Sequence, residues 1–196
     1  MTGEKKEIKM NKEVFYVSNL ITLSRFILLF FTAEFLLNKS YFFSIVFIIL
    51  IWISDLLDGY FARSRNEVSE LGKIIDPLAD KIVIAVIILI LLLQGILPLW
   101  FMIITILRDI IIFTGGLYLK YKKKIVLQSN WTGKLTVFTI GFTVVFMILI
   151  QWINIDFSSY HIEYMELLSK FLILLCIVMS VLSLGVYTNR FLKEIK

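Results

Sequence analysis

The sequence predicts an all-α integral membrane protein, a bundle of six transmembrane helices with a short N-terminal cytoplasmic segment. Hydrophobic residues make up 59% of the 196 positions, against about 45 to 50% in soluble domains, and the mean hydropathy is +0.89. The apolar runs are continuous and do not alternate with polar residues, and in lipid only a helix satisfies the backbone of such a run. These observations exclude an ordinary soluble domain.

Each predicted helix is an apolar run of about 20 residues, long enough to cross roughly 30 Å of hydrocarbon. In chain order the runs cover residues 19–37, 41–63, 71–93, 97–119, 131–153 and 165–187. The first run follows a charged segment that lacks an apolar core and cleavage site, so we expect an uncleaved anchor. No linker is long enough to separate a soluble domain. We therefore expect one membrane domain over residues 1–196, with residues 1–18 as a cytoplasmic juxtamembrane segment.

Lysine and arginine in the short loops predict the orientation of the chain. Nearly all of them fall on one side of the predicted spans: Lys5, Lys6, Lys9, Lys12, Arg63, Arg65, Lys73, Lys120, Lys122, Lys123, Lys124, Arg190, Lys193 and Lys196. We expect a multi-pass protein of the cytoplasmic membrane with both termini facing the cytoplasm. The net charge of +5 fits this bias and contact with anionic lipid head groups, so we expect no nucleic-acid partner.

Four aspartates lie in or beside the second and third runs, where a buried charge costs several kcal/mol by order of magnitude unless a partner offsets it. The spaced residues are Asp55, Asp58, Gly59, Ala62, Arg63, Gly72, Asp76 and Asp80. Residues three and four apart share a helix face, so Asp55 and Asp58 form one stripe and Asp76 and Asp80 another. The short polar loop over residues 64–71 makes the helices antiparallel. The stripes should therefore face each other and form an acidic cleft near the cytoplasmic face.

Carboxylates without a histidine or cysteine cluster favour Mg²⁺ or Mn²⁺ over zinc. Four carboxylates balance two divalent ions, and two such ions can hold the attacking and leaving oxygens of a displacement at phosphorus. A divalent-cation transporter is the non-enzyme alternative. The outward halves of both helices, residues 41–53 and 82–93, are almost wholly apolar, so no polar path across the membrane is visible.

The eight spaced residues match, position for position, the signature of the CDP-alcohol phosphotransferase (CDP-alcohol phosphatidyltransferase) family, membrane enzymes that make phospholipid head groups. The resemblance implies that an alcohol attacks the β-phosphorus of CDP-diacylglycerol and releases CMP. It makes Asp55, Asp58 and Asp76 the main metal ligands, with Asp80 as general base, as a further ligand, or as both. The nucleotide would lie against Asp58, Gly59, Ala62, Arg63 and Gly72. Helix packing by the glycines and interfacial anchoring by Arg63 stay open as alternatives.

Within the family, the segments 19–25 and 71–81 are most like bacterial phosphatidylglycerophosphate synthases, whose acceptor is sn-glycerol 3-phosphate. The candidate acceptor-binding residues are Asn19, Thr22, Arg25, Arg108 and Lys134. Arg108 and Asp109 are adjacent, so on a helix we expect them to point apart and each to need another partner. Lys134 is equally suited to anchoring at the interface.

Two departures from those synthases bear on the acceptor. An arginine expected about two turns after Arg108 is absent from residues 114–117, and a lysine expected soon after Lys134 is also absent. An acceptor that carries its own phosphate needs cationic partners. Phosphatidylglycerol, as in the cardiolipin synthases of this fold, is therefore the alternative acceptor, followed by serine or an inositol phosphate. The resemblance also implies a homodimer surrounded by membrane lipids.

Overall fold

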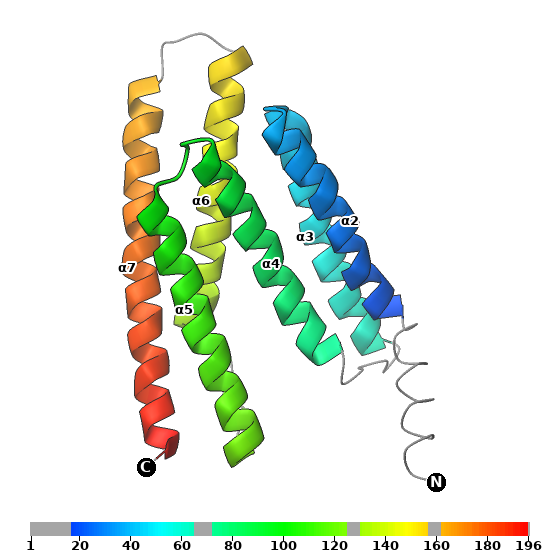
Figure 1. Ribbon diagram of the computed structural model, residues 1–196, viewed down its shortest axis with the longest axis vertical. Coiled ribbons are helices and arrows are strands. Elements are labelled where there is room, and N and C mark those ends of the chain that lie inside the picture. The colour runs from blue at the N-terminus through cyan, green and yellow to red at the C-terminus, as the bar shows by residue number, and fades with distance from the viewer. Residues whose placement is uncertain (1–16, 65–71, 125–129, 157–161, 196) are drawn as a thin grey trace. The chain divides into compact units, whose positions relative to one another are not determined.

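The computed structural model describes residues 17–64, 72–124, 130–156 and 162–195, with side chains for residues 23–57, 78–124, 130–154 and 164–194. All regular structure in these residues is helical (Figure 1), which confirms the predicted fold class. The elements are α2 (Val17–Leu37), α3 (Tyr41–Ser64), α4 (Gly72–Leu93), α5 (Leu99–Tyr118), the π-helical turn η1 (Leu119–Lys123), α6 (Trp131–Asp156) and α7 (Ile162–Ile195).

Length and apolar composition identify the helices that can cross a membrane. Among the described residues, Leu99–Lys123, Trp131–Asn154 and Tyr164–Glu194 meet both conditions, and Tyr41–Leu57 is a shorter apolar stretch. Large apolar side chains stay exposed along these helices, for example Leu56 at 72% and Phe138 at 66%. Exposed apolar surface on this scale suits contact with lipid. The chain is an all-α membrane protein.

The observed helices begin and end within a few residues of the predicted runs, except at the C-terminus. We predicted that the last span ends at residue 187, whereas α7 continues to Ile195. The added residues, 188–195, are mostly polar or charged. Hydropathy marks the part of a helix that suits lipid, and a helix can continue beyond it into water.

A tight turn joins α2 to α3. Lys39 takes a left-handed backbone conformation with φ 57°. The N–H of Lys39 donates to the carbonyl of Leu36 at 3.0 Å, and the N–H of Ser40 donates to the carbonyl of Phe35 at 2.8 Å. This pair of bonds is a Schellman motif, which satisfies the last carbonyls of α2. The turn makes α2 and α3 an antiparallel hairpin.

The chain forms two compact units, Met1–Ile90 and Leu91–Lys196. In the first unit α2 packs along α3, with the ring of Phe35 5.4 Å from that of Phe43 and 5.3 Å from that of Phe47. In the second unit α7 packs against both α5 and α6. The boundary falls near the end of α4, so residues 72–90 of this helix belong to the first unit.

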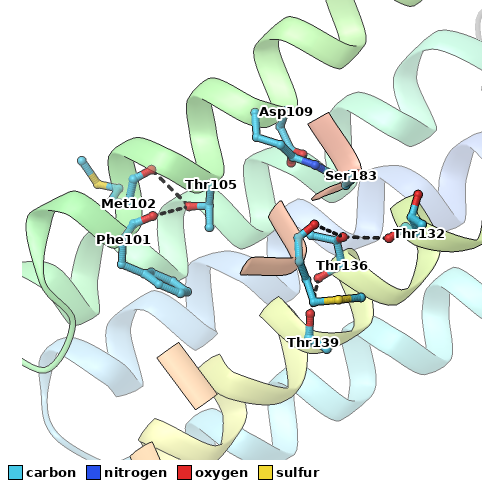
Figure 2. A network of polar contacts seen from close by, with 10 residues as sticks. Phe101, Met102, Thr105, Asp109, Thr132, Thr136, Thr139 and Ser183 are labelled. Atoms are coloured by element: carbon cyan, nitrogen blue, oxygen red, sulfur yellow. Dashed lines mark hydrogen bonds and ion pairs between the residues drawn. The ribbon is translucent and has the colours of Figure 1, made fainter. Parts of the chain in front are cut away.

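Hydroxyl groups of α6 face α7 inside the second unit. The hydroxyl of Thr136 shares its hydrogen between the carbonyl of Thr132 on its own helix, at 2.7 Å, and that of Met179 on α7, at 3.0 Å. The hydroxyl of Thr143 lies 3.0 Å from the buried thiol of Cys176. Figure 2 shows Thr136 between Thr132 and Thr139 on α6. Small polar residues often join membrane helices in this way.

Candidate active site

Arg25 of α2, Asp55 of α3 and Asp80 of α4 meet in the first unit. The Nη2 atom of Arg25 lies 3.2 Å from Oδ1 of Asp55, and its Nη1 atom donates a hydrogen bond to Oδ1 of Asp80. The guanidinium has separate N–H groups in a planar fork, so one arginine can contact two carboxylates at once. The first and last aspartates of the predicted motif therefore share one cation.

The helices explain why these three residues meet. Asp55 lies toward the C-terminal end of α3, and Asp80 lies in the N-terminal half of α4. Two antiparallel helices bring such positions to the same level, and Figure 1 shows α3 and α4 running in opposite directions. Both motif segments are helical, and the described carboxylates, those of Asp55 and Asp80, reach the same guanidinium.

Burial differs sharply between the arginine and its two partners. The side chain of Arg25 is 1% exposed, whereas those of Asp55 and Asp80 are 50% and 48% exposed. A buried guanidinium requires anionic partners because its desolvation is costly. One positive and two negative charges leave the group with a net charge of −1. This negative charge lies on the two half-exposed carboxylates.

The remaining motif residues lie on the same two helices, but their side chains are outside the described residues. They are Asp58, Gly59, Ala62 and Arg63 on α3, and Gly72 and Asp76 on α4. The helical backbone places Asp58 about one turn after Asp55 and Asp76 about one turn before Asp80. This register agrees with two carboxylate stripes.

The predicted acceptor-binding residues are divided between the two units. Asn19 and Thr22 lie on α2, but their side chains are outside the described residues. Arg25 contacts Asp55 and Asp80. Lys134 lies in the first turn of α6, where its side chain is exposed. Acceptor binding by these residues stays a prediction.

One prediction about Arg108 is wrong. Its Nη1 atom donates to Oδ1 of Asp109 at 2.5 Å, although we expected these neighbours to point apart. An arginine side chain is long enough to bend back over its own helix, so adjacency does not prevent contact. Its Nη2 atom also donates to the buried hydroxyl of Ser183 on α7 at 2.7 Å, and Asp109 and Ser183 lie close together in Figure 2. Ser183 was not among the predicted site residues, and the signal available for it was a serine within an apolar span.

Comparison of the sequence with known proteins shows which family the chain belongs to. The family model described as CDP-alcohol phosphatidyltransferase matches residues 15–182, which span both units. The chain is 32% identical over 161 residues to the CDP-diacylglycerol–glycerol-3-phosphate 3-phosphatidyltransferase of Aquifex aeolicus, an alignment that covers 81% of this chain and 89% of the relative.

The chain belongs to the CDP-alcohol phosphatidyltransferase family. It is thus a membrane-bound transferase of phospholipid biosynthesis, and the assignment favours an enzyme over a cation transporter. Shorter alignments link it to two kinds of relative. The enzyme of Mycoplasma genitalium with the same name as that of Aquifex is 42% identical over 42% of this chain and 34% of the relative. The human cardiolipin synthase (CMP-forming) is 40% identical over 36% of this chain and 24% of the relative.

Members of this family generally depend on divalent metal ions, and the donor chemistry on α3 and α4 fits such an ion. Asp55 and Asp80 offer half-exposed carboxylate oxygens from two helices to one point, and hard divalent cations prefer oxygen ligands of this kind. Asp58 and Asp76 belong to the same helices in the matching register. Within the residues whose side chains are described, no group of three or more acidic, histidine or cysteine side chains forms a metal site.

A mostly apolar cavity of about 400 Å³ lies between the C-terminal halves of α5 and α7. Its lining includes Thr114, Gly115 and Gly116 from α5, and Tyr187 and Phe191 from α7. Residues 114–117 are the segment from which the expected arginine is absent. In this protein, residues 114–116 of that segment border an apolar cavity.

Proposed function

We propose that this enzyme transfers the phosphatidyl group of CDP-diacylglycerol to sn-glycerol 3-phosphate, forming phosphatidylglycerophosphate and releasing CMP. The 32% identity to the Aquifex enzyme of that name, over 89% of its length, carries the proposal. The contact of Asp55 and Asp80 with one guanidinium supports it, because the two ends of the family motif come together in the fold.

We assign the binding of two divalent ions, Mg²⁺ or Mn²⁺, to Asp55, Asp58, Asp76 and Asp80. When bound, such ions neutralise the diphosphate and stabilise the charge of the departing CMP. Asp58, Gly59, Ala62, Arg63 and Gly72 are the proposed nucleotide-binding residues.

Asp80 is the proposed general base. Its carboxylate takes the proton from the acceptor hydroxyl, the hydroxyl oxygen forms a new bond to the β-phosphorus, and the bond from that phosphorus to the oxygen of CMP breaks. Half of its side chain is exposed, which supports access by an acceptor. Metal binding by Asp80 is compatible with the same fold.

The acceptor-binding residues in this proposal are Asn19, Thr22, Arg25, Arg108 and Lys134. Both termini and the aspartates face the cytoplasm, since the basic loops lie on that side. Residues 1–196 act as one domain, which the span of the family match across both units supports. We further propose a homodimer embedded in membrane lipids.

A second candidate acceptor is phosphatidylglycerol, which would make the enzyme a cardiolipin synthase. The apolar lining that Thr114, Gly115 and Gly116 contribute to the α5–α7 cavity favours this candidate, because a lipid acceptor needs less positive charge than glycerol 3-phosphate. Serine and inositol phosphate lack such support and rank below it.

The decisive experiment measures CMP release by purified protein with CDP-diacylglycerol, Mg²⁺ or Mn²⁺, and one acceptor at a time. We expect release with glycerol 3-phosphate, and at least a 100-fold loss in Asp80→Asn, since a positioned base contributes about 10² to 10⁴ in rate. Glu34→Gln removes an exposed carboxylate of α2 outside the motif and should leave the rate unchanged. Release only with phosphatidylglycerol would select the second candidate, and no metal-dependent release with any acceptor would refute the proposed enzyme.

A further inference from the structure

Arg25 is a fully buried cation on a buried face of α2. Its residue is 0% exposed, and Leu29, Thr32 and Leu36, which follow it at helical spacing on α2, are buried as well. A cation in this position is costly to desolvate unless anions lie beside it. Its location therefore requires an explanation beyond packing.

The contacts of Arg25 join three helices. From α2 the guanidinium reaches Asp55 on α3 and Asp80 on α4. The arginine is buried while both carboxylates are half exposed, so it holds them from the protein side and leaves their other side open to a ligand. Its two N–H contacts also restrict where each carboxylate can lie.

The charge on the motif explains why such a contact is useful. Four aspartates on two adjacent helices repel one another when all are ionised. A divalent cation would relieve that repulsion, but the helices must also hold together before a cation binds. Arg25 is a permanent cation that lowers the excess negative charge without depending on a bound ion.

We propose that Arg25 is a positioning residue of the aspartate site, whose guanidinium orients Asp55 and Asp80 and supplies their counter-charge until a divalent cation binds. This inference rests on the proposed function, since it treats these aspartates as metal ligands. It adds a second role to the acceptor binding proposed above, and this role rests on the contacts of Arg25 with the two carboxylates.

The test compares Arg25→Gln and Arg25→Lys with Lys39→Gln, which also removes one positive charge in the first unit. Lys39 is exposed in the turn between α2 and α3. The thermal midpoint of each purified protein is measured in detergent micelles, first with a chelator and then during titration with Mn²⁺. Mn²⁺ binding is followed independently by the electron paramagnetic resonance signal of the free ion.

Without metal, we expect Arg25→Gln to lower the midpoint by at least about 6 °C and Lys39→Gln to change it little. Saturating Mn²⁺ should reduce the deficit of Arg25→Gln by at least half, because the ion replaces the lost counter-charge. Arg25→Lys keeps the charge but loses the planar fork, so its deficit should be intermediate and should also shrink with Mn²⁺. A deficit that is the same with and without bound Mn²⁺ would overturn the proposal, since packing alone gives that result.

A wild-type protein that binds no Mn²⁺ would refute the metal assignment in the proposed function and not, by itself, the contact with the aspartates. The metal-free double variant Arg25→Gln with Asp80→Asn then decides whether Arg25 acts through Asp80. If Arg25→Gln lowers the midpoint less in the Asp80→Asn background than in the wild type, the positioning role is supported. Equal losses in both backgrounds would overturn it.

Discussion

Replacement of Arg108 by methionine tests the polar link between α5 and α7. Arg108 is 5% exposed and bonds to Ser183 at 2.7 Å and to Asp109 at 2.5 Å. Methionine keeps the apolar stem and most of the volume but loses both bonds. We expect a cost of about 3 kcal/mol, roughly half from the bond to the hydroxyl and half from removing the cation beside Asp109.

A double-mutant cycle with Ser183→Ala isolates the part that crosses between the helices. Hydrogen bonds between membrane helices average about 0.6 kcal/mol and reach about 1.7, whereas bonds to charged groups contribute about 1.5 to 3. For a buried, charge-assisted bond we expect a coupling energy of about 1.5 kcal/mol. Equilibrium unfolding in mixed micelles measures it.

Lys170→Met is the matched control, because Lys170 is an exposed cation on α7 whose loss should change stability by less than about 0.5 kcal/mol. A coupling energy between Arg108 and Ser183 below about 0.5 kcal/mol would refute the link. A normal unfolding free energy of Arg108→Met, combined with a raised KM for the acceptor, would instead favour the acceptor-binding role of Arg108.

Three further predictions concern the second unit. A Cβ at Gly116 would meet open space, whereas one at Gly133 would lie 3.1 Å from the ring of Tyr187. Gly116→Ala should therefore stabilise the folded protein by up to about 1 kcal/mol. Gly133→Ala should give the lower thermal midpoint of the two variants. Cys176 is 0% exposed, so a thiol reagent should label it at least roughly 100-fold more slowly in native micelles than in unfolded protein, and rapid native labelling would contradict its burial. Thr136→Val should cost about 0.6 kcal/mol in the same unfolding assay through loss of the bond to Met179, and an unchanged free energy would show that this bond contributes nothing.

Local sequence features predicted most of what lies along each helix. The run beginning at Tyr41 and the one ending at Leu93 match the bounds of α3 and α4 there, because a continuous apolar segment in lipid has to close its hydrogen bonds within itself. Helical periodicity also predicted that Asp55 and Asp80 belong to stripes that meet. The polar end of α7 was missed, since hydropathy does not report where a helix ends in water.

Contacts between side chains on different helices were harder to predict. Even within one helix such contacts are hard to predict: the contact of Arg108 with Asp109 depends on a side-chain rotamer that residue spacing does not specify. Its bond to Ser183 depends in addition on the rotation of α7 about its own axis. Packing sets that rotation, and several serines in the span offered equivalent partners in the sequence.

The sequence by itself determined the membrane class, the number and approximate limits of the described helices, and the register of the aspartate motif. These follow from local hydropathy and helical geometry, which act over a few turns of chain. Only the tertiary structure decided that Arg25, buried on α2, contacts Asp55 and Asp80. The partner of a buried charge is chosen by which helices pack together, and the desolvation of that charge is repaid only after they have done so.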